Sequence, residues 1–558
     1  MRETIRINPN TLQYRVFTST KRKKFVGHIN PFELGIGDET KDVWVFQLPN
    51  PTNIIIINNS NVSNLQSIIN NAVINTRLFF VAGIYEIGNI QLAGKPIQFV
   101  GELDSQGNNL VTFEGSQDIS GNTWTLDTGK YRTTVTSIVN QLPRFTAEEQ
   151  IGFYALLTEQ IWVNNIPYNP VPSIATMLNP RDFYYDKDTN QVHLQAIPTG
   201  VVKWGKHNHC IAQSNSNDGT LATSIATDNA IFANFNCNYY GGNRLGAVIG
   251  RRGYNKIGNI VPKYSAYYNV KIEYCRGIAF RADAFCSMIN CKSYNNGSGS
   301  MYPNRIDPDI YNAGWNIATA KYSSYWGNRM YANGSVGNEG GSSTKFIAAF
   351  FVHLKQCEHS HQGITSIGVI PSGYSMWLDD CSYIKIEDCY FHSSSAGNLF
   401  VEIAQFIEVW KTKLHPCLSG FHIFNSASND VHYHNNDIIS IDENAVFRLG
   451  DGDRFNTDNY EPFVLRDNVN VIFENNVIDL KSNRLAYQTT SSRTGRISPA
   501  YKNYTGKNIL FRNNTYKTQN PNLLSDFTVD LFVGLSAIQA LTDSNNVSFD
   551  WEQGSVLI

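Results

Sequence analysis

One short pattern, Val471-Ile472-Phe473-Glu474-Asn475-Asn476, decides the fold because it returns along the chain in related forms. Its clearest copies are Ile509-Leu510-Phe511-Arg512-Asn513-Asn514 and Val431-His432-Tyr433-His434-Asn435-Asn436. Each copy supplies alternating side chains for the two faces of a strand. Each then ends in two asparagines, which tolerate the left-handed backbone of a tight turn. The pattern therefore predicts strands that recur with a turn at a fixed place.

The spacing of earlier copies indicates the length of the repeat. Ile386 to Val409 is 23 residues, and Val409 to Val431 is 22. A period of this size is typical of one coil of a parallel β-helix, with three short strands and their turns. We therefore predict an all-β chain, a right-handed parallel β-helix from about Asn53 to Lys517, whose Asn-Asn pairs stack as a turn ladder. A sandwich or propeller would need regular Asn-Gly or Asp-Gly hairpin turns, which are scarce here.

Composition agrees with a solenoid. A chain of 558 residues is too long for one ordinary core, whereas a solenoid grows in one dimension because each coil contacts only its neighbours. Hydrophobic residues make up 42% of the chain and charged residues only 16%, which disfavours both disorder and a helical protein. The net charge of -2 provides no general attraction for nucleic acid or an anionic membrane.

The nine cysteines are odd in number and include no CxxC pair. We therefore expect buried thiols facing the coil interior, and neither a zinc site nor another metal or cofactor. His353, His359 and His361 share one stretch and form a weaker candidate for metal ligation.

Changes in the pattern divide the chain. Two stretches, 161–165 and 183–194, have the character of antiparallel hairpin strands and interrupt the coil period. The Asn-turn repeat ends after 517. We predict an N-terminal arm or attachment segment at 1–50, the start of the β-helix at 51–119, an inserted β-module at 120–205, the main β-helix with a catalytic face at 206–517, and a C-terminal cap at 518–558.

The strongest candidates for catalytic residues lie in two predicted strands one coil apart. The stretches Tyr374–Asp380 and Asn398–Ile403 align with an offset of 23 residues, the coil period found above. Alternation then turns Trp377 and Asp379 outward on one coil and Phe400 and Glu402 outward on the next. Asp379 and Glu402 are therefore predicted to be vertical neighbours.

Two carboxylates on adjacent coils, about 4.8 Å apart, could reach the separation of about 5–5.5 Å used by retaining glycosidases. Two like charges so close together are expected to raise one pKa, which leaves one group protonated as the acid. Trp377 and Phe400 could form a wall for stacking sugars. His422 and Arg448 fall on outward positions of the following coils and are candidates to bind hydroxyls or a sugar carboxylate.

The W-x-D strand followed one coil later by F-x-E resembles the β-helical retaining glycoside hydrolases, the β-xylosidase type in particular. The likeness covers about 120–450. It implies Asp379 as nucleophile and Glu402 as acid/base, and it includes a β-rich insertion early in the helix. Asp380 is a second candidate nucleophile, although alternation turns it away from Glu402.

Three other interpretations stay open. The acidic pair could lie on an ordinary solvated face. The chain could be a phage tailspike-like receptor-binding protein that holds host glycan, with its arm docked to the virion. It could instead be a polysaccharide lyase that uses Arg251, Arg252 or Lys263.

The expected partner is a polysaccharide or oligosaccharide, with no nucleic acid and no membrane, and a homotrimer is expected in a virion. Met1–Arg6 lacks the apolar stretch of a signal peptide. We therefore expect an extracellular or virion-associated protein.

Overall fold

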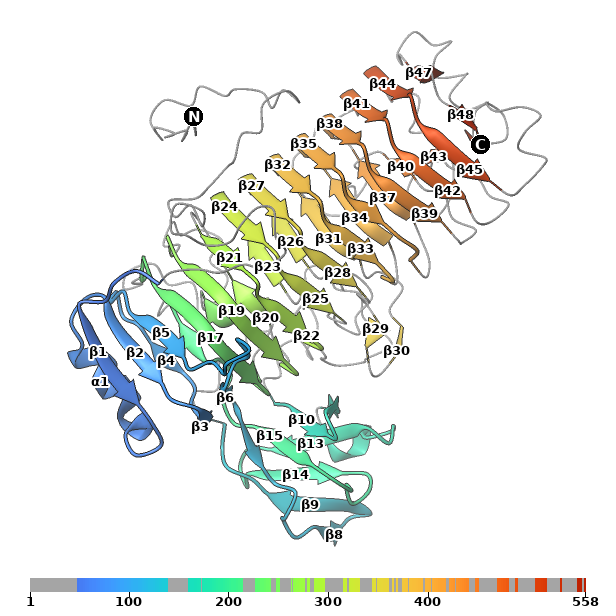
Figure 1. Ribbon diagram of the computed structural model, residues 1–558. Coiled ribbons are helices and arrows are strands. Elements are labelled where there is room, and N and C mark those ends of the chain that lie inside the picture. Colours follow the sequence, from blue (N-terminus) through green and yellow to red (C-terminus); the bar gives the residue numbers. More distant parts are fainter. Residues whose placement is uncertain are drawn as a thin grey trace, which may run out of the picture.

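The computed structural model describes residues 48–138, 159–171, 173–213, 226–241, 247–250, 262, 264–275, 278–281, 286–296, 315–318, 321–331, 344–347, 349–360, 364–365, 368–369, 374–379, 381–394, 397–402, 404–417, 421–426, 428–440, 447–450, 469–480, 487–489, 507–518, 532–533, 549–553 and 556–557. These residues form a right-handed parallel β-helix, so the predicted fold is confirmed. Figure 1 shows its coils stacked along one axis.

Each coil contributes to three ladders of parallel strands, called A, B and C here. Ladder A begins the coil and pairs strands from one end of the solenoid to the other. Its strands are β1 (Asn53–Ile57), β2 (Thr76–Phe80), β5 (Gln98–Gly101), the first halves of β17 (Ile231–Asn238) and β19 (Ala266–Glu273), β21 (Ser287–Ile289), β24 (Lys321–Trp326), β27 (Phe350–Lys355), β32 (Ser382–Glu387), β35 (Gln405–Trp410), β38 (Asn429–His434), β41 (Val469–Glu474), β44 (Lys507–Arg512) and β47 (Phe549–Gln553).

Ladder B follows ladder A after a short turn and belongs to the same 25-stranded sheet. Its strands are β3 (Gly83–Glu86), β6 (Val111–Glu114), the second halves of β17 and β19, β22 (Lys292–Tyr294), β25 (Arg329–Tyr331), β28 (Glu358–Ser360), β33 (Tyr390–His392), β36 (Lys413–Leu414), β39 (Asp437–Ser440), β42 (Val477–Leu480), β45 (Thr515–Thr518) and β48 (Val556–Leu557).

Ladder C closes the coil as a separate 12-stranded sheet. Its strands are β4 (Ile90–Gln91), β16 (Ile211–Ala212), β18 (Ala247–Gly250), β20 (Ile278–Arg281), β23 (Trp315–Ala318), β26 (Thr344–Ile347), β31 (Tyr374–Asp379), β34 (Gly397–Glu402), β37 (Phe421–Ser426), β40 (Phe447–Gly450), β43 (Tyr487–Thr489) and β46 (Phe532–Val533).

Two smaller units accompany the solenoid. The short helices η1 (Val62–Asn64) and α1 (Leu65–Asn71) follow β1, and Leu65 and Ile69 of α1 are buried in the solenoid core. Two mainly antiparallel sheets interrupt the coils and have their own core around Trp204. Their strands are β7 (Ser116–Asp118), β8 (Thr125–Asp127), β9 (Lys130–Thr134), β10 (Ile161–Val163), β11 (Ile166–Pro167), β12 (Asn169–Pro170), β13 (Asp182–Asp186), β14 (Gln191–Leu194) and β15 (Val202–Gly205).

Asparagines lock the turn between ladders A and B. Asn435, Asn475 and Asn513 adopt positive φ angles of 54°, 55° and 53°. The asparagine that follows Asn475, Asn476, is fully buried and accepts a hydrogen bond from the backbone N–H of Asn436 at 2.9 Å. Its amide donates to the carbonyl of Tyr433 at 3.2 Å. The predicted asparagine ladder is therefore confirmed, and it is the second asparagine of each pair that links the coils.

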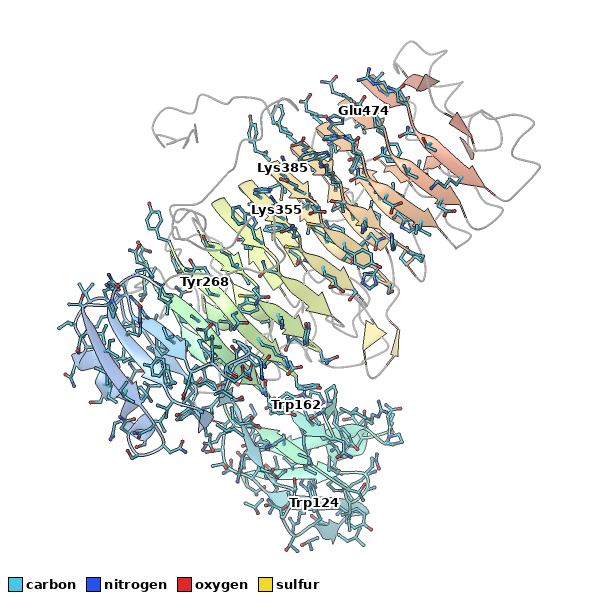
Figure 2. The ribbon with its side chains drawn as sticks, in the orientation of Figure 1. Trp124, Trp162, Tyr268, Lys355, Lys385 and Glu474 are labelled. Carbon is cyan, nitrogen blue, oxygen red and sulfur yellow. The ribbon has the colours of Figure 1, made fainter. Side chains whose placement is uncertain are left out.

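The outer face of ladder A changes character along the solenoid. One register row runs through Phe79, Val100, Ala233, Tyr268, Ile289 and Trp326, and the last five are buried although they point away from the core. The row then continues through Lys355, Glu387, Trp410, His434, Glu474 and Arg512. Figure 2 shows Tyr268, Lys355, Lys385 and Glu474 in this order along the coils.

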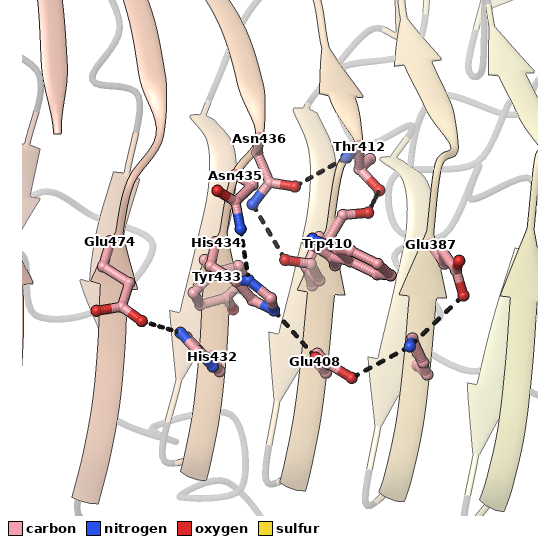
Figure 3. A network of polar contacts seen from close by, with 12 residues as sticks. Glu387, Glu408, Trp410, Thr412, His432, Tyr433, His434, Asn435, Asn436 and Glu474 are labelled. Carbon is pink, nitrogen blue, oxygen red and sulfur yellow. Dashed lines mark hydrogen bonds and ion pairs between the residues drawn. The ribbon is translucent and has the colours of Figure 1, made fainter. Parts of the chain in front are cut away.

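The charged half of this face contains linked hydrogen bonds and ion pairs, some of which Figure 3 shows. Glu387 accepts a hydrogen bond from His353 at 3.1 Å and lies 3.5 Å from the ammonium of Lys385, which in turn lies 3.6 Å from Glu408. Glu408 accepts a hydrogen bond from His434 at 3.0 Å. Buried charges are stable only when they are paired, so these contacts explain why Lys385 is only 6% exposed.

The pKa values follow from these contacts. Burial alone would raise the pKa of Glu387, but the hydrogen bond from His353 and the nearby lysine cations outweigh it and lower the pKa. Burial lowers the pKa of His353 below its usual 6.5 and outweighs the opposing effect of Glu387.

Several details differ from the sequence predictions. Val409 pairs with Tyr433, and Val431 with Ile407, so this coil has 24 residues and not the 22 that the spacing of Val409 and Val431 indicated. Beyond 518, strands β46, β47 and β48 pair in parallel with the preceding coil, and the other residues of the predicted C-terminal cap lie outside the described ranges.

Three other predictions concern the cysteines, the N-terminal arm and membrane-spanning helices. All nine cysteines are free and buried, as predicted. Residues 1–47, which include nearly all of the predicted arm, lie outside the described residues. Within the described ranges, no helix has the length and apolar character that crossing a membrane requires.

The asparagine ladder predicts a position-specific loss of stability. Replacing Asn476 with alanine leaves the N–H of Asn436 and the carbonyl of Tyr433 without these partners, so we expect the free energy of unfolding to fall by about 2–4 kcal/mol in a urea titration. The matched control is Asn475→Gly, because Asn475 is exposed and glycine accepts its positive φ. An equal loss at the two positions would contradict the ladder.

The network on ladder A predicts lower stability in acid. Because the folded-state pKa of Glu387 is lowered, its stabilising contribution is complete above its ordinary pKa of about 4.5 and is lost as the pH falls further. We expect Glu387→Gln to lower the free energy of unfolding by about 2–3 kcal/mol at pH 7 and by less at acidic pH. The control is Glu358→Gln, whose side chain is 39% exposed beside His392 and should contribute under about 1 kcal/mol. Parallel pH curves for wild type and Glu387→Gln would refute this assignment.

Candidate functional site

The two candidate strands lie on adjacent coils of ladder C in the predicted register. Strand β31 pairs with β34 so that Trp377 faces Phe400 and Asp379 faces Glu402 as Cα partners. Parallel strands stack about 4.8 Å apart, so the backbones that carry the two acidic residues are direct neighbours along the axis. The prediction that Asp379 and Glu402 are vertical neighbours is confirmed.

Alternation separates the core from the outer face at these strands. Leu378 and Val401 belong to the solenoid core, whereas Trp377 and Phe400 form a separate cluster with Tyr374 packed against it. The rings of Trp377 and Phe400 are 4.9 Å apart at 31°, and those of Tyr374 and Phe400 are 5.3 Å apart. The outer face therefore carries a compact aromatic wall.

Glu402 is enclosed beside this wall. Its side chain points away from the core, yet the residue is only 2% exposed, and Trp377 is 3% exposed. The indole Nε1–H of Trp377 donates a hydrogen bond to Oε2 of Glu402 at 3.2 Å. Removing a carboxylate from water is costly without such a donor. The alternative of a solvated face is therefore wrong for Glu402.

The backbones of the other predicted residues are placed, but two side chains are not. Asp379 and Arg448 occupy described positions in β31 and β40, while their side chains lie outside the described part of the structure. Arg448 is the Cα partner of Phe424, which is itself the partner of Phe400. Arg448 thus shares the register row of the aromatic wall, two coils beyond Phe400.

His422 is placed next to Asn398 of the adjacent coil, and nothing in its contacts assigns it to the outer face that the sequence predicted. It is 3% exposed, and its Nδ1 lies 3.0 Å from the amide nitrogen of Asn398, which also donates to the carbonyl of His415 at 2.7 Å. Burial and the nearby His415 lower the pKa of His422 to about 4. His422 is therefore a neutral imidazole near pH 7 that accepts the Asn398 amide hydrogen at Nδ1.

Long connections enter ladder C just before the candidate strands. Residues 332–343 join β25 to β26, and residues 361–373 join β28 to β31 and include a small hairpin of β29 (Ile364–Thr365) and β30 (Gly368–Val369). The next coil makes the same crossing with residues 393–396 alone. Long connections on a rigid scaffold commonly carry binding functions, and one of these two leads directly into β31, the strand that carries Asp379.

The proposed metal stretch does not converge on one site. His353 faces outward and pairs with Glu387, whereas His359 is fully buried inside the coil, where its Nδ1 lies 2.9 Å from the carbonyl oxygen of Ser375. His361 lies outside the described residues, as do Arg251, Arg252 and Lys263, the residues considered for a lyase. Among the described residues, no group of three His, Cys, Asp or Glu side chains is arranged to hold a metal ion.

The sequence did not indicate Tyr374 as part of the wall or Trp377 as a donor to Glu402. Tyr374 is the Cα partner of Gly397, so no side chain stands opposite it on the next coil to mark the position. The Trp377–Glu402 bond joins residues 25 apart in sequence and runs diagonally between two register rows. The orientation of the two side chains determines this bond, and the strand register alone does not predict that orientation.

Comparisons with known proteins give distant likenesses in fold. No family model and no curated protein matches the chain. A solved structure of XylC in complex with xylose has 10% identity and a TM-score of 0.49, covering 88% of this chain and 82% of that one. The A-module of the mannuronan C-5 epimerase AlgE4 from Azotobacter vinelandii has 10% identity and a TM-score of 0.45, covering 86% and 88%. The tailspike gp61 of Pseudomonas phage phi297 has 11% identity and a TM-score of 0.29, covering 82% and 71%. Likenesses this distant leave the activity to be inferred from the chain's own residues.

Proposed function

We propose that this protein is a retaining glycoside hydrolase that cleaves a polysaccharide, with Asp379 as nucleophile and Glu402 as acid/base. The observation that carries the proposal is the position and burial of the Glu402 carboxyl group. Its carboxyl group lies on the outer face, is enclosed by an aromatic wall, receives an indole hydrogen bond and stands in register with Asp379. An outward-facing carboxyl group held this far from water, one coil from a second acidic residue, is a candidate for a catalytic acid.

The spacing of the coils favours retention. Retaining glycosidases hold their two carboxyl groups about 5–5.5 Å apart, whereas inverting enzymes need a wider gap to admit a water molecule. Side chains on adjacent coils start from backbones about 4.8 Å apart, which fits the shorter separation. A pair two coils apart would fit the wider one.

The chemistry then follows in two balanced steps. The Asp379 carboxylate attacks the anomeric carbon while Glu402 gives its proton to the departing glycosidic oxygen, so the C–O bond breaks and a glycosyl ester forms. Glu402, now ionised, takes a proton from a water molecule that attacks the same carbon and releases Asp379. Trp377 and Phe400, which are 3% and 7% exposed, form the apolar side of the proposed site beside Glu402.

The two acidic residues should fail in different ways. Asp379→Ala removes the attacking group, so we expect no glycosyl-enzyme with any substrate. Glu402→Ala removes protonation of the leaving oxygen, which an activated aryl glycoside hardly needs. That variant should form the intermediate, stall, and be rescued by azide, which attacks without a general base.

Intact-protein mass spectra and reducing-end release measure these effects, and Glu358→Gln on ladder B serves as a surface carboxylate control. If both variants degrade the natural glycan at the wild-type rate, the proposal fails. Binding of the glycan by the wild-type protein without release of reducing ends would point instead to a non-catalytic, tailspike-like receptor-binding protein.

The indole hydrogen bond gives a separate prediction. Trp377→Phe keeps an aromatic ring in the wall but removes the donor to Oε2 of Glu402. We expect kcat to fall about tenfold, as the loss of one hydrogen bond to a charged group would cause, with KM changed little. The conservative change Phe400→Tyr keeps the wall and should leave kcat within about threefold. A rise in KM with kcat unchanged would assign Trp377 to binding alone.

A further inference from the structure

A row of side-chain positions runs along ladder C parallel to the solenoid axis. The strand register links Lys345 to Trp377, Trp377 to Phe400, Phe400 to Phe424, and Phe424 to Arg448. At about 4.8 Å per coil, these four steps span about 19 Å. The row therefore places one cationic residue at each end of three consecutive aromatic positions.

The acidic pair occupies the neighbouring row, near the middle of this span. Asp379 follows Ile347 by one coil, and Glu402 precedes Ser426 by one coil. The two carboxyl-bearing positions thus lie beside the aromatic residues and not beside the cations. A glycan laid along the aromatic row would have its cleaved bond near the centre and its flanking sugars toward the two ends.

The overall charge of the chain does not explain a preference for anions on ladder C. Charged residues make up only 16% of the sequence, and the net charge of -2 provides no general attraction for an anion. A preference for anions on this face must therefore come from local residues. Arginine pairs with carboxylate or sulfate through two parallel hydrogen bonds, and lysine acts as a compact point charge.

We infer that the glycan bound on ladder C is anionic and carries carboxylate or sulfate groups that are recognised at the positions of Lys345 and Arg448. The location of the cleaved bond rests on the proposed function, whereas the charge preference does not. The glycan runs along the solenoid axis, past the coils that carry Trp377, Phe400 and Phe424. Lys345 lies one coil before Asp379, and Arg448 lies two coils after Glu402.

The experiment measures binding in the absence of turnover. The full-length Glu402→Gln protein is titrated calorimetrically with uronate oligosaccharides built on galacturonate, mannuronate, guluronate and glucuronate. Each is compared with its carboxyl-reduced neutral form and with a sulfated version of that neutral form. We expect at least one charged oligosaccharide to bind about tenfold or more tightly than its neutral form, with an affinity that weakens as salt is added.

Single changes at the two ends locate the effect. Lys345→Gln and Arg448→Gln, each in the Glu402→Gln background, should each weaken binding of the charged oligosaccharide about tenfold and leave the neutral form within about twofold. Lys413→Gln is the matched control, because Lys413 is an exposed cation on ladder B. The uronate and sulfated probes together identify which anion the site takes.

The outcomes separate this inference from the proposed function. If no charged probe binds more tightly than its neutral form, or if neither end variant changes the preference, the inference is overturned. The hydrolase then still stands if wild-type protein releases reducing ends from a neutral glycan. Salt-sensitive binding that depends on Lys345 and Arg448, without any cleavage by the wild-type protein, would support the inference and contradict the proposed hydrolase activity.

Discussion

The register between successive coils is the constraint on which the rest of this structure depends. A slip of one residue would turn every inward side chain outward, and a slip of two would shift every outer row. The bonds between Asn436, Asn476 and Asn514 resist both slips, because each asparagine satisfies backbone groups only in the correct alignment. Their burial raises the cost of a misaligned coil, since the amides would then have no water to bind.

Fixed register gives each outer face a set of rows with distinct chemistry. On ladder A the outer row is apolar from Phe79 to Trp326 and charged from Lys355 onward. That charged half pairs its histidines and lysines with glutamates inside the protein, which indicates a structural role. On ladder C the enclosed Glu402 accepts a hydrogen bond from the indole of Trp377 and lies beside the aromatic wall, so its surroundings differ from those of Glu387 on ladder A. This difference directs attention to ladder C as the place for chemistry.

The sequence predicts local coil geometry well and long-range contacts poorly. The 23-residue offset correctly aligned Asp379 with Glu402, because only short turns separate those strands. The same reasoning failed for Val409, whose coil contains one residue more. The bond from His432 to Glu474 joins residues 42 apart, because the long connection 451–468 lies between their coils and breaks the period. Burial of Glu402 was also beyond the sequence, since alternation gives the direction of a side chain but not what lies over it.

The most direct test of the central claim is the stereochemistry of cleavage, followed by proton NMR from the first minutes of reaction with a natural or aryl glycan substrate. Carboxyl groups on adjacent coils predict that the first hemiacetal released has the same anomeric configuration as the bond that was cut, and that the other anomer appears only later by mutarotation. Initial release of the opposite anomer would contradict a nucleophile and an acid/base placed one coil apart. An unsaturated sugar product would contradict hydrolysis itself.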